Sequence, residues 1–134
     1  MKLLLVGFSE KEAEDIENAL GIPVLAVPEQ LKGLKVEELL KAESEGGELR
    51  WTGEKFLIMD GLDNEGIKRV IETVRRLSKE RVIFATTTET NLKWTLEELL
   101  EELRAEDEYF RALKEARKQV KERKGLFLNI GNVK

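Results

Sequence analysis

The sequence contains no cysteine and no histidine. The absence of cysteine excludes disulfides, thiolate nucleophiles and zinc sites with sulfur ligands. The absence of histidine excludes imidazole bases and most transition-metal sites. The common hydrolase triads are therefore impossible, and we expect neither a cofactor nor a metal site.

A net positive charge and long apolar runs are also lacking. The formal net charge of −4 argues against nucleic acid as the default partner. No apolar stretch approaches the roughly 20 residues that a membrane span needs, so we expect a cytoplasmic protein. Charged residues reach 37%, which favours a thermophilic source, with an ordinary highly charged mesophilic protein as the alternative.

Three short apolar runs each end in small polar residues and are followed by a helical pattern. They are 3–6 before Gly7 and Ser9, 56–59 before Asp60 and Gly61, and 82–85 before Thr86 and Thr87. This pattern is typical of strands in a parallel α/β sheet. We expect one α/β domain over 1–134 with a four-stranded, mostly parallel, doubly wound sheet. A flavodoxin-like strand order would place the first and third strands side by side.

The remaining elements follow from caps and periodicity. We expect strands at 2–6, 22–27, 55–59 and 81–85, helices after Ser9 and Asp63, and a short helix at 36–42. Glu12 and Glu98 complete capping boxes with Ser9 and Thr95. A helical arm is expected over 95–124, with a kink or break near 105–108. Segment 43–53 is expected to be a loop or loose hairpin, 126–130 a strand or docked tail, and no internal repeat is evident.

The carboxyl ends of parallel strands meet at one edge of a sheet, where ligands bind. The candidate ligand-binding residues are therefore Gly7, Ser9, Asp60, Gly61, Thr86, Thr87 and Asn91. Neither nucleotide-binding glycine motif is present. The same residues are equally suited to tight turns and helix caps, so a purely structural role stays open.

The arm is strongly polarised in charge. Residues 97–108 include seven acidic residues and one arginine, and 111–124 include seven basic residues and two glutamates. Acids first and bases last complement the helix dipole. The same order suits antiparallel pairing with a second copy. A third alternative is contact of the basic half with RNA. Candidate interaction residues are Arg117 and Lys121 on the arm, Trp51 in the glycine-rich loop, and Trp94, which alternatively packs as a hydrophobic staple.

One stretch of the chain resembles a known family. An apolar strand leads into Met59-Asp60-Gly61, and a later strand leads into Ala85-Thr86-Thr87-Thr88, followed by Asn91-Leu92-Lys93-Trp94-Thr95-Leu96. The region Phe56–Phe110 is similar to a small domain of unknown function known from archaea and clostridia. The resemblance implies the fold and an archaeal or clostridial source, but no chemistry.

Three classes of function remain. The first is a non-enzymatic binding or regulatory module that contacts a second copy of the chain or another protein. The second is a domain that binds a small ligand or anion at the carboxyl edge of the sheet. The third is an enzyme acting on a phosphorylated or carboxylated metabolite, with Asp60 as acid or base.

Overall fold

The computed structural model describes residues 1–42, 51 and 53–129, and side chains as far as residue 119. The chain divides into two compact units, Met1–Glu101 and Glu102–Lys134. Residues 43–50, which contain most of the expected loop or hairpin, lie outside the described part.

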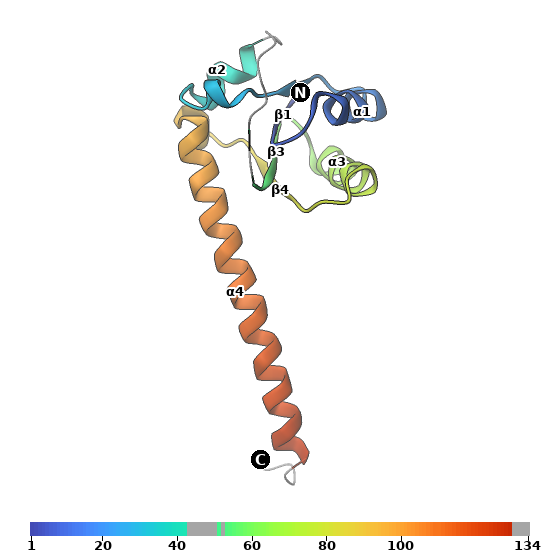
Figure 1. Ribbon diagram of the computed structural model, residues 1–134, viewed down its shortest axis with the longest axis vertical. Coiled ribbons are helices and arrows are strands. Elements are labelled where there is room, and N and C mark those ends of the chain that lie inside the picture. The colour runs from blue at the N-terminus through green and yellow to red at the C-terminus, as the bar shows by residue number, and fades with distance from the viewer. Residues whose placement is uncertain (43–50, 52, 130–134) are drawn as a thin grey trace. The chain divides into compact units, whose positions relative to one another are not determined.

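The first unit contains a four-stranded sheet with helices on both faces (Figure 1). The strand order is β2-β1-β3-β4, so β1 and β3 are neighbours as expected. The elements are β1 (Lys2–Val6), α1 (Glu10–Leu20), β2 (Val24–Ala26), the short 3-10 helix η1 (Glu29–Leu31), α2 (Val36–Lys41), β3 (Lys55–Asp60), α3 (Asn64–Leu77), β4 (Val82–Thr86), the 3-10 helix η2 (Asn91–Lys93) and α4 (Leu96–Asn129). The α/β class is confirmed.

The sheet is mixed, which corrects the expectation of a mostly parallel sheet. β1 and β2 are parallel, and so are β3 and β4, but β1 and β3 run antiparallel. The register pairs Lys2 with Asp60, Leu4 with Ile58, and Val6 with Phe56. The carboxyl ends of β1 and β3 therefore lie at opposite edges of the sheet.

Apolar side chains on both faces explain the near-continuous apolar runs of the central strands. Side chains alternate between the two faces of a strand. Leu3, Leu5, Leu57 and Met59 pack with α1 and α3 in one cluster. Leu4 and Ile58, which are paired across β1 and β3, alternate with these residues and so face the other side of the sheet. Figure 1 shows α2 and the start of α4 on that side. All of these strand residues are buried.

The first unit is built from two halves with the same order of elements: strand, helix, strand, 3-10 helix, helix. Gly7 and Gly61 both have positive φ, at 85° and 74°, and each is followed two residues later by an N-cap, Ser9 or Asp63. Glu38 and Glu98 accept equivalent capping bonds from the backbone N–H groups of Lys35 and Thr95.

Contacts between the halves are reciprocal. Val36 N–H donates to the Trp94 carbonyl, and Leu96 N–H donates to the Leu34 carbonyl, both at 2.9 Å. Lys35 forms an isolated antiparallel bridge with its counterpart Thr95. Leu4 likewise pairs with its counterpart Ile58. These contacts define a pseudo-twofold axis through the sheet, and the expectation of no internal repeat is wrong.

The second unit contains the part of α4 that follows Glu101. The helix is assigned without interruption from Leu96 to Asn129, so the expected break near 105–108 is absent. Residues 126–129 belong to the helix and do not form the expected strand, while residue 130 lies outside the described part.

Candidate functional site

The carboxyl ends of β3 and β4 bring several predicted residues together. The two strands are parallel and pair Met59 with Thr86, so Asp60 and Thr87 follow at the same edge. Thr87 N–H donates to the Met59 carbonyl at 2.9 Å. The Thr87 hydroxyl donates to Asp60 Oδ1 at 2.7 Å. The polar groups that were predicted to face a ligand are therefore bonded to each other in this structure.

Asn91 organises the loop that follows β4. Its side-chain oxygen accepts from Thr88 N–H at 2.7 Å, and its amide nitrogen donates to the Thr86 carbonyl at 3.1 Å. Its own backbone N–H donates to the Thr88 hydroxyl at 3.0 Å. The residue is buried. These bonds use both the oxygen and the nitrogen of the Asn91 side-chain amide, so Asn91 fixes the conformation of the loop; we call this arrangement the Asn91 clamp.

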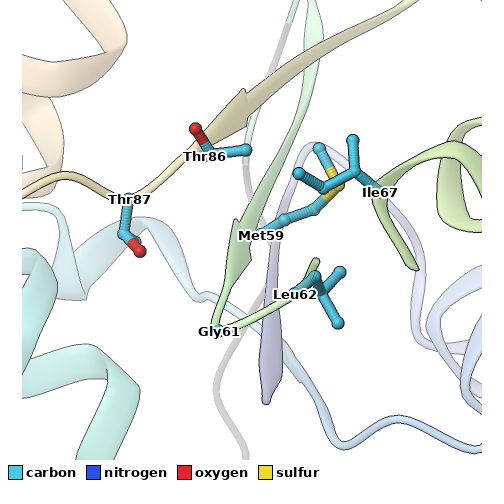
Figure 2. A pocket seen from close by; sticks show the side chains of 6 residues that line it. All are labelled: Met59, Gly61, Leu62, Ile67, Thr86 and Thr87. Atoms are coloured by element: carbon cyan, nitrogen blue, oxygen red, sulfur yellow. The ribbon is translucent and has the colours of Figure 1, made fainter. Parts of the chain in front are cut away.

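A cavity of about 180 Å³ lies beside this cluster (Figure 2). It is lined by Met59, Gly61, Leu62, Ile67, Thr86 and Thr87. Figure 2 shows apolar side chains from β3, the following turn and α3 on one side, and the two threonines of the β4 end on the other. The lining combines apolar side chains with two threonines, but the volume is below the roughly 300–1,000 Å³ that is usual for ligand pockets, so it suits only a very small molecule.

Gly7 and Ser9 lie at the other edge of the sheet, which corrects their assignment to the same crevice as Asp60. A Cβ on Gly7 would lie 2.9 Å from the Glu54 carbonyl oxygen, so Gly7 packs against the chain just before β3. Ser9 is the N-cap of α1, and its expected capping box with Glu12 is present. The antiparallel β1–β3 pair causes this separation.

Residues of the first half correspond to the cavity lining of the second half through the pseudo-twofold axis. The pseudo-twofold axis relates Gly61 and Leu62 to Gly7 and Phe8, and Thr86 to Ala26. Phe8 is fully buried and belongs to the apolar cluster beneath α1. Its ring also lies 5.1 Å from Lys55 Nζ. Phe8, the counterpart of Leu62, therefore belongs to the core, and Ala26 is the counterpart of the cavity-lining Thr86.

Lys55 is a buried charge that the sequence interpretation missed. Its Nζ lies 2.5 Å from Glu12 Oε2 and 3.3 Å from Glu80 Oε2, and its side chain is 9% exposed. A lysine at the start of an apolar run usually marks a solvent-exposed strand end, so the sequence carried little signal for this ion pair.

The ion pair shifts both pKa values. Burial by itself raises the pKa of Glu12, but hydrogen bonds from Lys55 and from the Ser9 backbone outweigh burial and lower it. Burial by itself lowers the pKa of Lys55, but its hydrogen bond and charge interaction with Glu12 outweigh burial and raise it. Both groups are therefore stabilised in their charged forms.

We expect the Lys55–Glu12 ion pair to stabilise the protein at neutral pH and to lose this effect in acid. Folding lowers the pKa of Glu12. The stability that Glu12 contributes is therefore present above its pKa in the unfolded chain, near 4.3, and is lost as the pH falls through its pKa in the folded protein. Lys55→Met should lower the free energy of unfolding by about 1 kcal/mol at pH 7, because Glu12 is partly exposed. Urea unfolding should show this difference shrinking by pH 3.

Lys11→Met is the matched control, because Lys11 is exposed on α1. It should change stability little at either pH. If Lys55→Met lowered the free energy of unfolding as much at pH 3 as at pH 7, the assigned ion pair would be contradicted. The contribution of Lys55 to stability depends on pH in the opposite direction, because folding raises its pKa. This contribution is present below the pKa of Lys55 in the unfolded chain and is lost as the pH rises through its pKa in the folded protein.

The predicted interaction residues have different surroundings. Trp51, the candidate interaction residue of the glycine-rich loop, is partly buried, and its indole N–H donates to the Val27 carbonyl at 2.5 Å. Trp94 is also partly buried and precedes the capping box of Thr95 and Glu98. Arg117 is exposed on α4, while the side chain of Lys121 lies outside the described part.

Two exposed aromatic side chains stand next to each other on α4. Tyr109 and Phe110 are 64% and 62% exposed. Their ring centroids lie 5.7 Å apart with an interplanar angle of 69°, an edge-to-face contact. In the sequence these two residues are the aromatics beside the basic half of the arm, where they bear on the RNA alternative. It is the largest exposed aromatic feature among the described side chains.

Neither a metal centre nor a membrane span is found in the described residues. No group of three or more acidic side chains there could hold a metal ion. No helix there combines the length and apolarity needed to cross a membrane.

The comparisons with known proteins give one match. Residues 55–110 match the family model of a domain of unknown function (DUF3783), so the expected resemblance is confirmed for this segment. The match begins at β3 and ends at Phe110, within α4. No curated protein and no solved structure matches the chain. The archaeal or clostridial origin and the role of the threonine-rich motif stay predictions.

Proposed function

We propose that this protein, which carries a DUF3783 domain over residues 55–110, is a non-enzymatic interaction module of the cytoplasm. It binds a protein helix through the part of α4 that follows Glu101. The highly charged, cysteine-free composition supports a cytoplasmic location and a thermophilic source.

The observation that carries this proposal is the exposed pair Tyr109 and Phe110. Aromatic side chains are enriched at protein interfaces because they bury a large area with little loss of rotamer freedom. Here they lie between an acidic stretch, 97–108, and a basic stretch, 111–124. An apolar centre flanked by opposite charges supplies both affinity and orientation.

A photo-crosslinking residue at position 110 tests the proposal. Benzoylphenylalanine introduced for Phe110 in the full chain, expressed in cells, should form a covalent adduct with a protein partner on irradiation. Benzoylphenylalanine at Glu108, a neighbouring exposed position on another side of α4, is the matched control. Adducts from position 110 no more abundant than those from position 108 would contradict an interaction face there.

Small-ligand binding is a second candidate function, favoured by the cavity beside Met59 and Thr86. A small-molecule adduct retained by the purified protein in native mass spectrometry would support this function.

A further inference from the structure

Sequence spacing on α4 after Glu101 places its apolar side chains on one seam. Leu103 and Phe110 occupy the same position of successive heptads, a, and Leu113 occupies position d. Two charged residues share the seam, Glu106 at d and Arg117 at a. We call Leu103, Glu106, Phe110, Leu113 and Arg117 the α4 seam. All five lie in the part of the helix with described side chains.

We propose that the partner of the α4 seam is a second copy of this chain, packed antiparallel. This inference rests on the proposed function and names its partner. In an antiparallel pair, a positions of one helix meet d positions of the other. Phe110 then packs on Leu113 of the second copy, and the symmetry of the pair repeats this contact. Four large apolar side chains form the centre of the interface.

The same register pairs the charged seam residues with opposite signs. Glu106 meets Arg117 of the second copy on each side of the apolar centre. Outside the seam, Asp107 and Lys114 occupy the flanking e positions, which face each other between antiparallel helices. From 106 to 117 the register therefore places apolar side chains against apolar ones and an acidic side chain against a basic one.

Charge excludes the parallel alternative. A parallel pair of identical helices would place Glu106 against Glu106 and Arg117 against Arg117. It would also align the two acidic stretches, 97–108, and the two basic stretches, 111–124. Like charges facing each other across an interface cost several kcal/mol. Antiparallel packing turns each of these repulsions into an attraction.

A charge exchange across the seam tests this register. Sedimentation equilibrium of the full chain at moderate salt should show a dimer. Glu106→Arg alone and Arg117→Glu alone should each raise the dissociation constant at least tenfold, because each creates two like-charged contacts per dimer. The double variant restores opposite charges and should return to within about threefold of the unaltered chain.

Matched controls separate seam effects from a change in net charge. Glu108→Arg and Lys118→Glu make the same charge changes at exposed positions outside the seam and should leave the dissociation constant within about threefold. Phe110→Ser should abolish the dimer over the measured range. Circular dichroism of each variant checks that the helix is retained.

The outcomes distinguish this inference from the proposed function. Failure of the double variant to restore dimerisation overturns the antiparallel register. A chain that stays monomeric at all concentrations, yet crosslinks from position 110 to a different protein, overturns the second copy as partner but keeps α4 as an interaction element. A monomer without adducts overturns both.

Discussion

Replacing Leu4 by alanine is expected to lower the free energy of unfolding by about 3 kcal/mol, since buried leucine-to-alanine changes cost about 2–5. Leu4 is fully buried in β1 and pairs with Ile58 across the antiparallel centre of the sheet. Helices cover both faces of the sheet, so little of the resulting cavity can close by relaxation. Urea or thermal unfolding of the full chain would measure the change.

Leu77→Ala provides the matched control. It deletes the same atoms from a side chain that is 46% exposed at the end of α3, and should cost less than about 1 kcal/mol. Ile58→Ala should match Leu4→Ala, because the two residues are counterparts on the pseudo-twofold axis. A Leu4 variant within 1 kcal/mol of the unaltered protein would show that this pair is not at the centre of the core.

Asn91→Ala is the second large expected effect, a loss of about 2 kcal/mol in unfolding free energy. The change removes the acceptor for Thr88 N–H and the donor to the Thr86 carbonyl at a buried position. Buried polar groups left without partners cost about 1–3 kcal/mol each, and partial access of water reduces that cost. Chemical denaturation gives the difference directly.

Two further variants identify which bond matters. Asn91→Asp keeps the acceptor but cannot donate to the Thr86 carbonyl, so it should be nearly as damaging as Asn91→Ala. Thr88→Val removes only the hydroxyl that accepts from Asn91 N–H and should cost about 1 kcal/mol. If the Asn91→Asp variant were as stable as the unaltered protein, the hydrogen bond from Asn91 to the Thr86 carbonyl would not contribute to stability, and the role given to Asn91 would be wrong.

Local chemistry explains what could be predicted from the sequence. The runs 3–6 and 56–59 are strands because their apolar side chains are buried between covering helices. In the run 82–85 only Ile83 is buried, and the other apolar side chains are partly exposed. Ser9, Asp63 and Thr95 begin helices because their side-chain oxygens accept backbone N–H bonds. These interactions span three residues, so each signal lies within one short stretch of chain.

The direction of β3 could not be predicted in the same way. A strand whose two faces are both covered has the same near-continuous apolar sequence in a parallel sheet as in an antiparallel one. Direction depends on the pairing of Leu4 with Ile58, far apart in the chain. That pairing separates Gly7 and Ser9 from the cluster of Asp60, Thr86, Thr87 and Asn91, which were correctly grouped because β3 and β4 are parallel.

The internal repeat did leave a trace in the sequence. Val-Glu-Glu-Leu-Leu at 36–40 parallels Leu-Glu-Glu-Leu-Leu at 96–100. Comparison of these two segments, each at the start of a helix after a 3-10 turn, would have suggested two related halves. A twofold arrangement of such halves requires β1 and β3 to run antiparallel, so the repeat also explains the mixed sheet.

The most direct test of the account is the distance between identical spin labels in the dimer. The absence of cysteine allows a single label at Ala105 or at Ala112, exposed positions one heptad apart on α4. At 1.5 Å per residue, the antiparallel register predicts axial separations of about 2 Å at 112 and about 20 Å at 105. Double electron–electron resonance should therefore give a clearly longer distance at 105. Equal distances at the two positions, or no dipolar coupling at either, would contradict the antiparallel α4 pair.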